Sequence, residues 1–150
     1  TGTGDTVMIR ELFQKDRPVF VRFDNRAFRV GPRRRDRLQG RVVDMQPVRK
    51  RFEAKRLVCW ANDAITGRNG QRCALCRQRW SCAERLRLML LLDGLEQGHT
   101  PAILEIGHDS FEALDAFLDE IGTESLAQTT TIISMERDQG RLRFTFHKAP

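Results

Sequence analysis

Apolar and polar residues alternate over several short stretches of the chain, and a period of two residues is typical of β-strands with one buried face. The alternation is clearest near the C-terminus, where Leu142, Phe144 and Phe146 are separated by polar residues. Together with the stretch 129–135, they predict a hairpin that turns at 138–140. The pattern therefore favours a mainly β protein.

Two further β-prone regions precede this hairpin. Residues 19–23 and 27–30 are separated by Asp24-Asn25, a turn-forming pair, and predict an N-terminal hairpin. Residues 40–52 carry Val42, Val43, Met45 and Val48 and predict another strand. Between 85 and 92 the apolar side chains run almost without interruption from Leu86, which is typical of a strand covered on both faces. After a predicted loop at 94–101, residues 102–106 form the next expected strand.

One segment has the period of a helix instead. Five apolar residues between 111 and 121 recur at helical spacing, and Gly122 supplies a stop signal. Asp109 or Ser110 is expected to cap the start, with Glu112 in a capping-box-like position three residues after Asp109. The apolar positions are Phe111, Leu114, Phe117, Leu118 and Ile121.

All four cysteines fall between these elements, in a turn-rich segment that follows the strand 40–52. Cys73 and Cys76 have the two-residue spacing with which one turn can present two thiolates to one metal ion, and Cys59 and Cys82 complete a set of four. Four thiolates suit a structural tetrahedral zinc and leave no open position for catalysis. Disulfides, free thiols and an iron–sulfur cluster are the alternatives that the spacing leaves open.

The charge of +6 is unevenly distributed along the 150 residues. Residues 22–56 hold 13 basic and four acidic residues, whereas residues 88–150 hold four basic and 11 acidic ones. Such asymmetry is the electrostatic pattern expected for a protein that binds a polyanion. The alternative is a solvated basic face. Codon composition could explain why only four of the 26 basic residues are lysines, but it does not explain the clustering.

The predicted element order from residue 40 is strand, cysteine segment, strand, strand, helix, strand, strand, which is the order of an OB-fold with an insert after its first strand. With the pair Cys73-Ala-Leu-Cys76 in that insert, the chain resembles the C-terminal single-stranded DNA-binding domain of the replication protein A large subunit. It is also similar to small single-stranded DNA-binding proteins of phages and mobile elements. The chain departs from the pattern in having no Tyr and an unpaired first cysteine, Cys59, and residues 1–39 have no counterpart.

The resemblance implies a mainly β, five-stranded OB-fold barrel with one helix and a zinc-ribbon insert at 57–84 between strands 1 and 2. The expected organisation is an N-terminal β-hairpin and basic arm at 1–39, followed by the OB-fold domain at 40–150. The implied partner is single-stranded nucleic acid, with DNA favoured over RNA. The implied zinc ligands are Cys59, Cys73, Cys76 and Cys82.

Single strands bind cationic grooves whose aromatic rings stack on the bases. Trp60 and Trp80 are candidates for stacking, although small zinc modules also use aromatic rings to cover the metal. Residues 33–35 are either a flexible basic arm or a solvated loop. The full set of candidate contacts is Arg33, Arg34, Arg35, Arg49, Lys50, Arg51, Lys55, Arg56, Trp60, Arg77, Arg79 and Trp80.

Other function classes find less support in the sequence. His99, His108 and His147 are scattered without a catalytic partner, and Thr1-Gly-Thr-Gly4 has no strand before it to make a phosphate loop, so we expect no enzyme. The longest aliphatic run, 88–92, is too short to span a membrane, and no leader pattern opens the chain, so we expect a cytoplasmic protein. The alternative function is a zinc-containing interaction or regulatory subunit of a nucleic-acid-processing complex, with its acidic C-terminal half contacting a protein.

Overall fold

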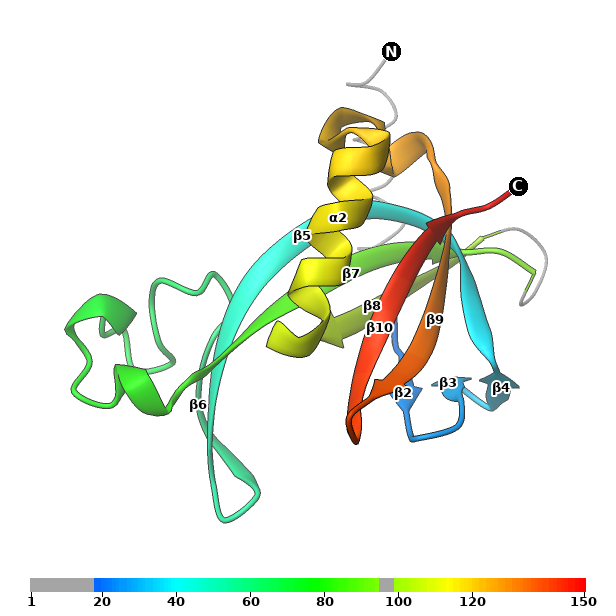
Figure 1. Ribbon diagram of the computed structural model, residues 1–150. Helices are drawn as coiled ribbons and strands as arrows, with labels where there is room; N and C mark the ends of the chain where they lie inside the picture. The colour runs from blue at the N-terminus through cyan, green and yellow to red at the C-terminus, as the bar shows by residue number, and fades with distance from the viewer. Residues whose placement is uncertain (1–17, 95–98) are drawn as a thin grey trace.

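In the part of the chain that the structure describes, a seven-stranded sheet and a three-stranded sheet are accompanied by one α-helix (Figure 1). The structure is a computed structural model that describes residues 18–94 and 99–150. The strands are β1 (Val19–Phe20), β2 (Arg22–Phe23), β3 (Phe28–Val30), β4 (Arg33–Arg35), β5 (Arg37–Glu53), β6 (Arg56–Ala61), β7 (Ala83–Leu92), β8 (Thr100–Ile106), β9 (Thr130–Asp138) and β10 (Arg141–Lys148), and the helix is α2 (Phe111–Ile121). The mainly β class predicted from the sequence is confirmed. No helix in the described ranges has the length and apolar character needed to cross a membrane.

The long strand β5 joins the parts of the larger sheet, whose order is β1-β8-β7-β5-β9-β10. Its first residues, 37–41, pair with β9, and residues 40–50 pair with β7. Its last part, 49–53, pairs with β6, which protrudes from the sheet. Gly40 allows β5 to approach β7 closely, because a Cβ at this position would lie 2.1 Å from the carbonyl oxygen of Leu91.

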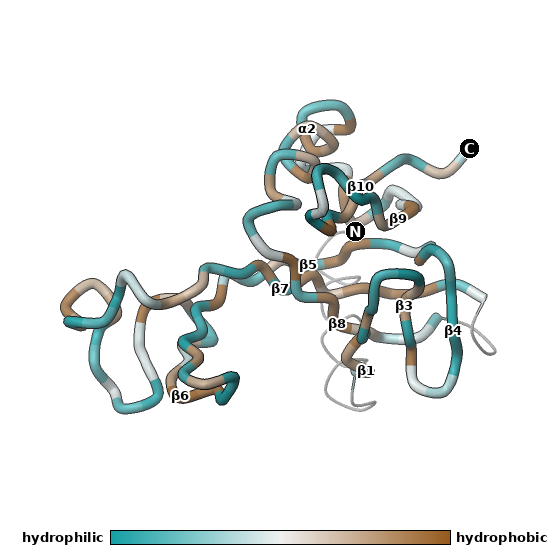
Figure 2. Tube along the Cα trace, turned by 60° about the horizontal axis from the view of Figure 1, so that its bottom comes forward, coloured by the Kyte–Doolittle hydropathy of each residue, from teal (hydrophilic) through white to brown (hydrophobic). Residues whose placement is uncertain are grey.

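The core lies between the sheet and the helix, as the apolar patterns predict. Leu88, Leu90 and Leu92 of β7 are buried, and Leu114 and Phe117 of α2 pack in the same cluster. Further members come from β8 and β10, so the core joins strands that are more than 50 residues apart in the sequence. Figure 2 shows these apolar segments gathered in the body of the molecule.

The ends of α2 are only partly as predicted. Gly122 follows the helix with a φ of +82°, a conformation that suits glycine, and the predicted stop is confirmed. The predicted capping box is wrong, since no side chain caps the helix start. The buried Ser110 hydroxyl instead accepts a hydrogen bond of 2.8 Å from the backbone N–H of Phe144 in β10. This bond fixes the helix start against the sheet.

The C-terminal hairpin is confirmed. β9 and β10 pair from Asp138–Arg141 to Thr131–Lys148, and the two turn residues Gln139 and Gly140 both have positive φ. Two successive residues with positive φ are the requirement of a type I′ hairpin turn, whose twist matches that of the strands.

The predicted N-terminal hairpin is confirmed only in part, because the N-terminal region is divided between the two sheets. β1 pairs in parallel with β8, whereas β2 and β3 form a short antiparallel pair around Asp24. Residues 33–35, expected to be an arm or a loop, form β4 and pair with β3. A strand can be this polar because pairing uses only backbone groups, and Arg33 and Arg34 remain exposed. The part of the predicted N-terminal region before residue 18, with Thr1-Gly-Thr-Gly4, lies outside the described residues, as does the middle of the predicted loop at 94–101.

The larger sheet does not close into a barrel. Over the described residues no ladder joins β8 to β10, although the five strands expected from the sequence are all present. Part of the free edge of β8, at Ala102 and Ile103, is occupied by β1. Phe28 of the small sheet stacks on Phe144 of β10, with 5.6 Å between the ring centroids.

Candidate nucleic-acid interface and cysteine lobe

The cysteines lie in a separate protrusion, which we call the cysteine lobe and define as residues 56–82. It consists of β6, a turn-rich segment, and two short 3-10 turns at Cys73–Leu75 and Arg79–Ser81 (Figure 1). The turn-rich segment folds back on itself through a bridge between Thr66 and Arg72. Ala61 is the only buried residue of the lobe.

Hydrogen bonds within the fold-back hold its shape. The Asp63 carboxylate accepts bonds of 2.9 Å from the backbone N–H groups of Ile65 and Thr66, and these bonds hold the pKa of Asp63 below its usual value. The backbone N–H of Cys73 donates to the carbonyl of Ile65 at 2.7 Å, which brings the 3-10 turn back toward β6. The first cysteine and the pair are thereby placed in one small lobe.

The four cysteines are free thiols, each half-buried. Burial raises the pKa of the Cys82 thiol, and the neighbouring thiols of Cys59 and Cys76 raise it further. The charges of Arg49 and Arg51 act on Cys82 in the opposite direction. Cys59 and Cys76 are therefore close enough to Cys82 to act on its pKa. Among the described residues, however, no three Cys, His, Asp or Glu side chains already lie close enough together to hold a metal ion.

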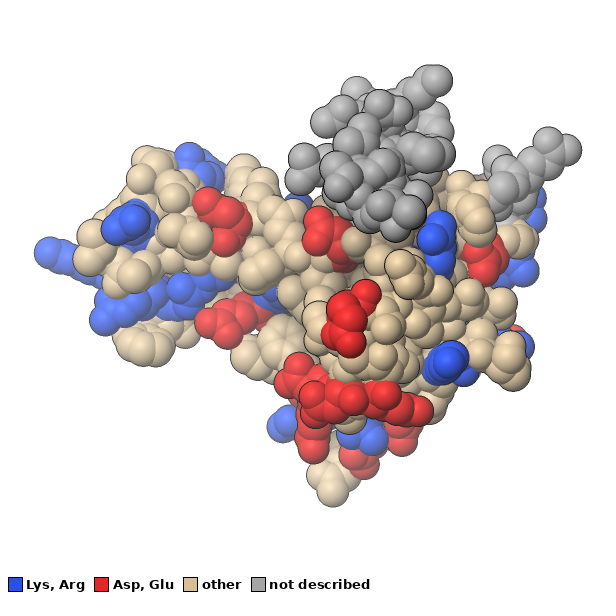
Figure 3. Space-filling view, turned by 90° about the horizontal axis from the view of Figure 1, so that it is seen from above, with Lys and Arg blue, Asp and Glu red and all other residues tan. Residues whose placement is uncertain are grey.

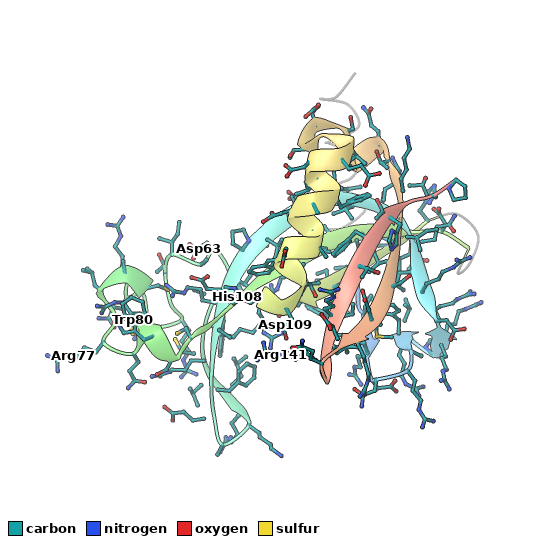
Figure 4. The ribbon with its side chains drawn as sticks, in the orientation of Figure 1. Asp63, Arg77, Trp80, His108, Asp109 and Arg141 are labelled. Carbon is teal, nitrogen blue, oxygen red and sulfur yellow. The ribbon has the colours of Figure 1, made fainter. Side chains whose placement is uncertain are left out.

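The two tryptophans of the lobe have different surroundings. Trp80 is 83% exposed, with the Arg79 guanidinium 5.0 Å from the ring centroid, so it does not cover the cysteines (Figure 4). Arg77 also projects from this end of the lobe. Trp60 is 37% exposed and lies beside Arg68, whose guanidinium carbon is 5.3 Å from the ring centroid. Both rings present surface on which a base could stack.

The predicted basic cluster at 49–51 is divided by the alternation of β5. Lys50 lies opposite Trp60 across the β5–β6 ladder, so these two side chains share one face. Arg49 and Arg51 point to the other face, where both are more than 80% buried. There Arg49 lies 3.7 Å from Glu84 and donates to the carbonyl of Arg79 at 3.4 Å. Arg49 and Arg51 thus belong to the surroundings of the cysteines.

The face that carries Lys50 extends across five strands. Pairing places Glu105 of β8 opposite Arg87 of β7, and the same face carries Lys50 of β5 and Trp60 of β6. At the far edge β1 adds Phe20, which lies opposite Ile103, two residues before Glu105. We call these residues the five-strand face: Phe20, Glu105, Arg87, Lys50 and Trp60.

Glu105 connects the two cations of this face. Its carboxylate accepts hydrogen bonds from the Lys50 Nζ at 2.7 Å and from the Arg87 Nε at 2.9 Å. Burial alone raises the pKa of Glu105, but the bonds from Lys50 and Arg87 outweigh it and hold the pKa below its ordinary value. An ammonium has three donors and a guanidinium five, so both cations keep donors for a further anion. The three charges leave the centre of the face with one net positive charge.

The candidate contacts chosen from the sequence do not include Phe20, Arg87 or Glu105. The available signal was a single carboxylate in the apolar strand 102–106, which requires a cationic partner when it is buried. Which cation it pairs with depends on the order of the strands, and the order is not visible in the sequence.

The remaining predicted contacts lie apart from this face. Lys55 is at the exposed tip of the β5–β6 hairpin, next to Arg56. Residues 33–35 lie in the small sheet on the other side of the body from the cysteine lobe (Figure 1), where Arg35 donates to the carbonyl of Gly94 at 3.1 Å. The structure therefore does not bring the arginines of β4 together with the lobe.

The surface charge separates in the same way as the sequence charge. Lys and Arg side chains gather over the cysteine lobe, whereas Asp and Glu gather on the body around α2 (Figure 3). His108 and Asp109 lie at the start of α2, where each contacts one exposed charged residue: Glu84 at 3.5 Å and Arg141 at 3.7 Å, respectively (Figure 4).

Comparison of the chain with protein-family models, with curated proteins and with solved structures finds no match.

Proposed function

We propose that this protein is a non-enzymatic single-stranded nucleic-acid-binding protein, with DNA as its ligand, and that its larger sheet is a partly open OB-fold. In an OB-fold, strands 2 and 3 and the loops after strands 1 and 4 bind the oligonucleotide. In this chain the corresponding elements are β7 and β8, the cysteine lobe, and the turn at 139–140. The order of strands and helix and the antiparallel pairing of β5 with both β7 and β9 support the assignment.

The observation that carries the proposal is the pairing of Lys50 with Trp60 on a face shared with Arg87. Binding of a single strand requires cations for the phosphates and rings for the bases. The five-strand face offers both, and it includes β7 and β8, the strands that correspond to the ligand-binding strands of an OB-fold. It is next to the lobe, over which basic side chains gather (Figure 3).

We also propose that Cys59, Cys73, Cys76 and Cys82 hold one structural zinc ion. Their chemistry fits, because four thiolates are a common zinc ligand set, and the cations of Arg49 and Arg51 lie beside them to offset its negative charge. A second reason is the scarcity of burial. The lobe has one buried residue, so apolar burial alone does little to stabilise its 27 residues. The zinc would hold the lobe in place and take no part in chemistry.

A fluorescence polarisation titration tests the function directly. The probes are labelled oligothymidylate, a duplex and an RNA of the same length, each at two salt concentrations. We expect the single strands to bind more tightly than the duplex, with weaker binding at higher salt because phosphate neutralisation releases counterions. Equal or tighter binding of the duplex would instead point to the arginines of β4 acting on a groove or backbone. Absence of binding to all three probes would leave the protein-interaction role, supported by the acidic surface around α2.

A further inference from the structure

We infer that Phe20 and Arg87 form a base-stacking platform supplied by the N-terminal strand β1, a second platform besides Trp60. The inference rests on the proposed single-strand binding and adds a specific residue pair to it. The Arg87 guanidinium carbon lies 5.8 Å from the centroid of the Phe20 ring. Bases stack on aromatic rings and on guanidinium planes, so this pair offers a composite surface for one base.

The exposure of Phe20 is unusual for its position. The ring is 52% exposed, although its neighbour on the same face, Ile103, is only 6% exposed. A large ring left half exposed at the edge of a sheet face loses the stabilisation that its burial would give. A ligand that stacks on the ring would recover it.

Arg87 is held ready for this role. Its side chain is only 18% exposed, its Nε donates to Glu105, and its guanidinium carbon lies over the Phe20 ring. Within the described residues the terminal N–H groups of Arg87 make no hydrogen bond, so they can donate to a phosphate. Glu105 is the positioning residue, because the same carboxylate also fixes Lys50. A base and its adjacent phosphate could therefore be recognised together.

The two platforms lie at opposite ends of the five-strand face. Phe20 is on β1 and Trp60 is on β6, with β8, β7 and β5 between them. Four strand spacings correspond to about 19 Å, which is long enough for a few nucleotides. The cations Lys50 and Arg87 lie between the rings, where the phosphates of a strand crossing the face would pass.

The variant Phe20→Leu tests the platform. It preserves the backbone pairing of β1 with β8 and most of the apolar bulk but removes the ring. We expect it to bind oligothymidylate about 5- to 150-fold more weakly than the unmodified protein, with an unchanged salt dependence. An abasic oligonucleotide of the same length should bind both proteins equally, since it has phosphates but no bases.

The matched control is Phe23→Leu, because Phe23 is 41% exposed but packs edge-on against Phe144, off the five-strand face. It should leave oligothymidylate binding unchanged. Arg87→Lys is a second test variant. This variant retains the charge beside Glu105 but loses the stacking plane. It should weaken the binding of oligothymidylate more than the binding of the abasic oligonucleotide. Melting temperatures are measured for all variants.

Three outcomes would overturn the inference. If Phe20→Leu binds oligothymidylate like the unmodified protein, the ring does not stack. If it loses affinity equally for both oligonucleotides, Phe20 supports the fold rather than the bases. If the unmodified protein binds neither oligonucleotide, the proposed function fails and the platform fails with it. Only the last outcome affects the proposed function.

Discussion

The body of the sheet and the cysteine lobe are stabilised in different ways. In the body, β7 and β8 alone contribute eight fully or nearly fully buried apolar residues, covered by α2 on one side. The lobe has Ala61 as its only buried residue, and two of its largest apolar side chains, Leu75 and Trp80, are more than 70% exposed. The body can fold by burying its core, whereas the lobe requires another source of stability and leaves its rings available to a ligand.

The sharpest way to test this contrast is to remove the metal. We expect one zinc per chain, and structural zinc sites contribute on the order of 10 kcal/mol or more to their modules. Chelation, or the variant Cys76→Ser, should make the cysteine lobe, residues 56–82, susceptible to limited proteolysis while the rest of the sheet keeps its melting transition. Elemental analysis and mass spectrometry of the fragments provide the measurements. A metal-free preparation whose lobe resists protease would contradict the zinc proposal.

The second prediction compares one leucine from each region. Leu104→Ala in β8 removes a side chain with no exposed surface and should lower the free energy of unfolding by about 2–5 kcal/mol. Leu75→Ala in the lobe removes a side chain that is 71% exposed. It should change the free energy of unfolding by less than about 0.5 kcal/mol. Chemical denaturation of both variants measures the difference. Similar losses for the two would show that the lobe contributes to the core after all.

The regions also differ in how far their structure could be predicted from sequence. In the body, the apolar run from Leu86 and the helical spacing of Leu114 and Phe117 predict the elements correctly, because local periodicity reflects which side of an element is buried. The bond from the Ser110 hydroxyl to β10 was unpredictable, since it joins residues 34 positions apart. The same holds for the parallel pairing of β1 with β8.

For the candidate site, residue types were predictable but their grouping was not. Arg49, Lys50 and Arg51 form one basic run in the sequence, yet alternation along β5 puts Lys50 on one face and the two arginines on the other. The site residues contributed by other strands, Arg87 and Glu105, depend on sheet order. Long-range pairing therefore decides which charges meet, and no local pattern encodes it.

The third prediction concerns the ion pairs of Glu105. Because its pKa is lowered in the folded state, its contribution to stability is present above the ordinary Glu pKa of about 4.3 and is lost as the pH falls through the lower folded value. Glu105→Gln should cost about 1.5–3 kcal/mol at neutral pH, the range for hydrogen bonds to charged groups. The difference from the unmodified protein should shrink below about pH 4. Denaturation at several pH values checks this, and a difference independent of pH would show that the ion pairs contribute little.

The smallest expected effect separates the two faces of β5 in binding. Lys50→Met retains the aliphatic stem and removes one cation of the five-strand face, so the salt slope of oligothymidylate binding should flatten by about 0.7, the value for one neutralised phosphate on a single strand. The matched control, Lys148→Met, changes an exposed lysine near the end of β10 and should leave the slope unchanged. Titrations at about four or more salt concentrations resolve a change of this size in the salt slope, provided that both variants are measured with the same probe. If Lys148→Met flattens the slope and Lys50→Met does not, the bound oligonucleotide runs along the edge of the sheet formed by β10. The five-strand face is then not the binding surface.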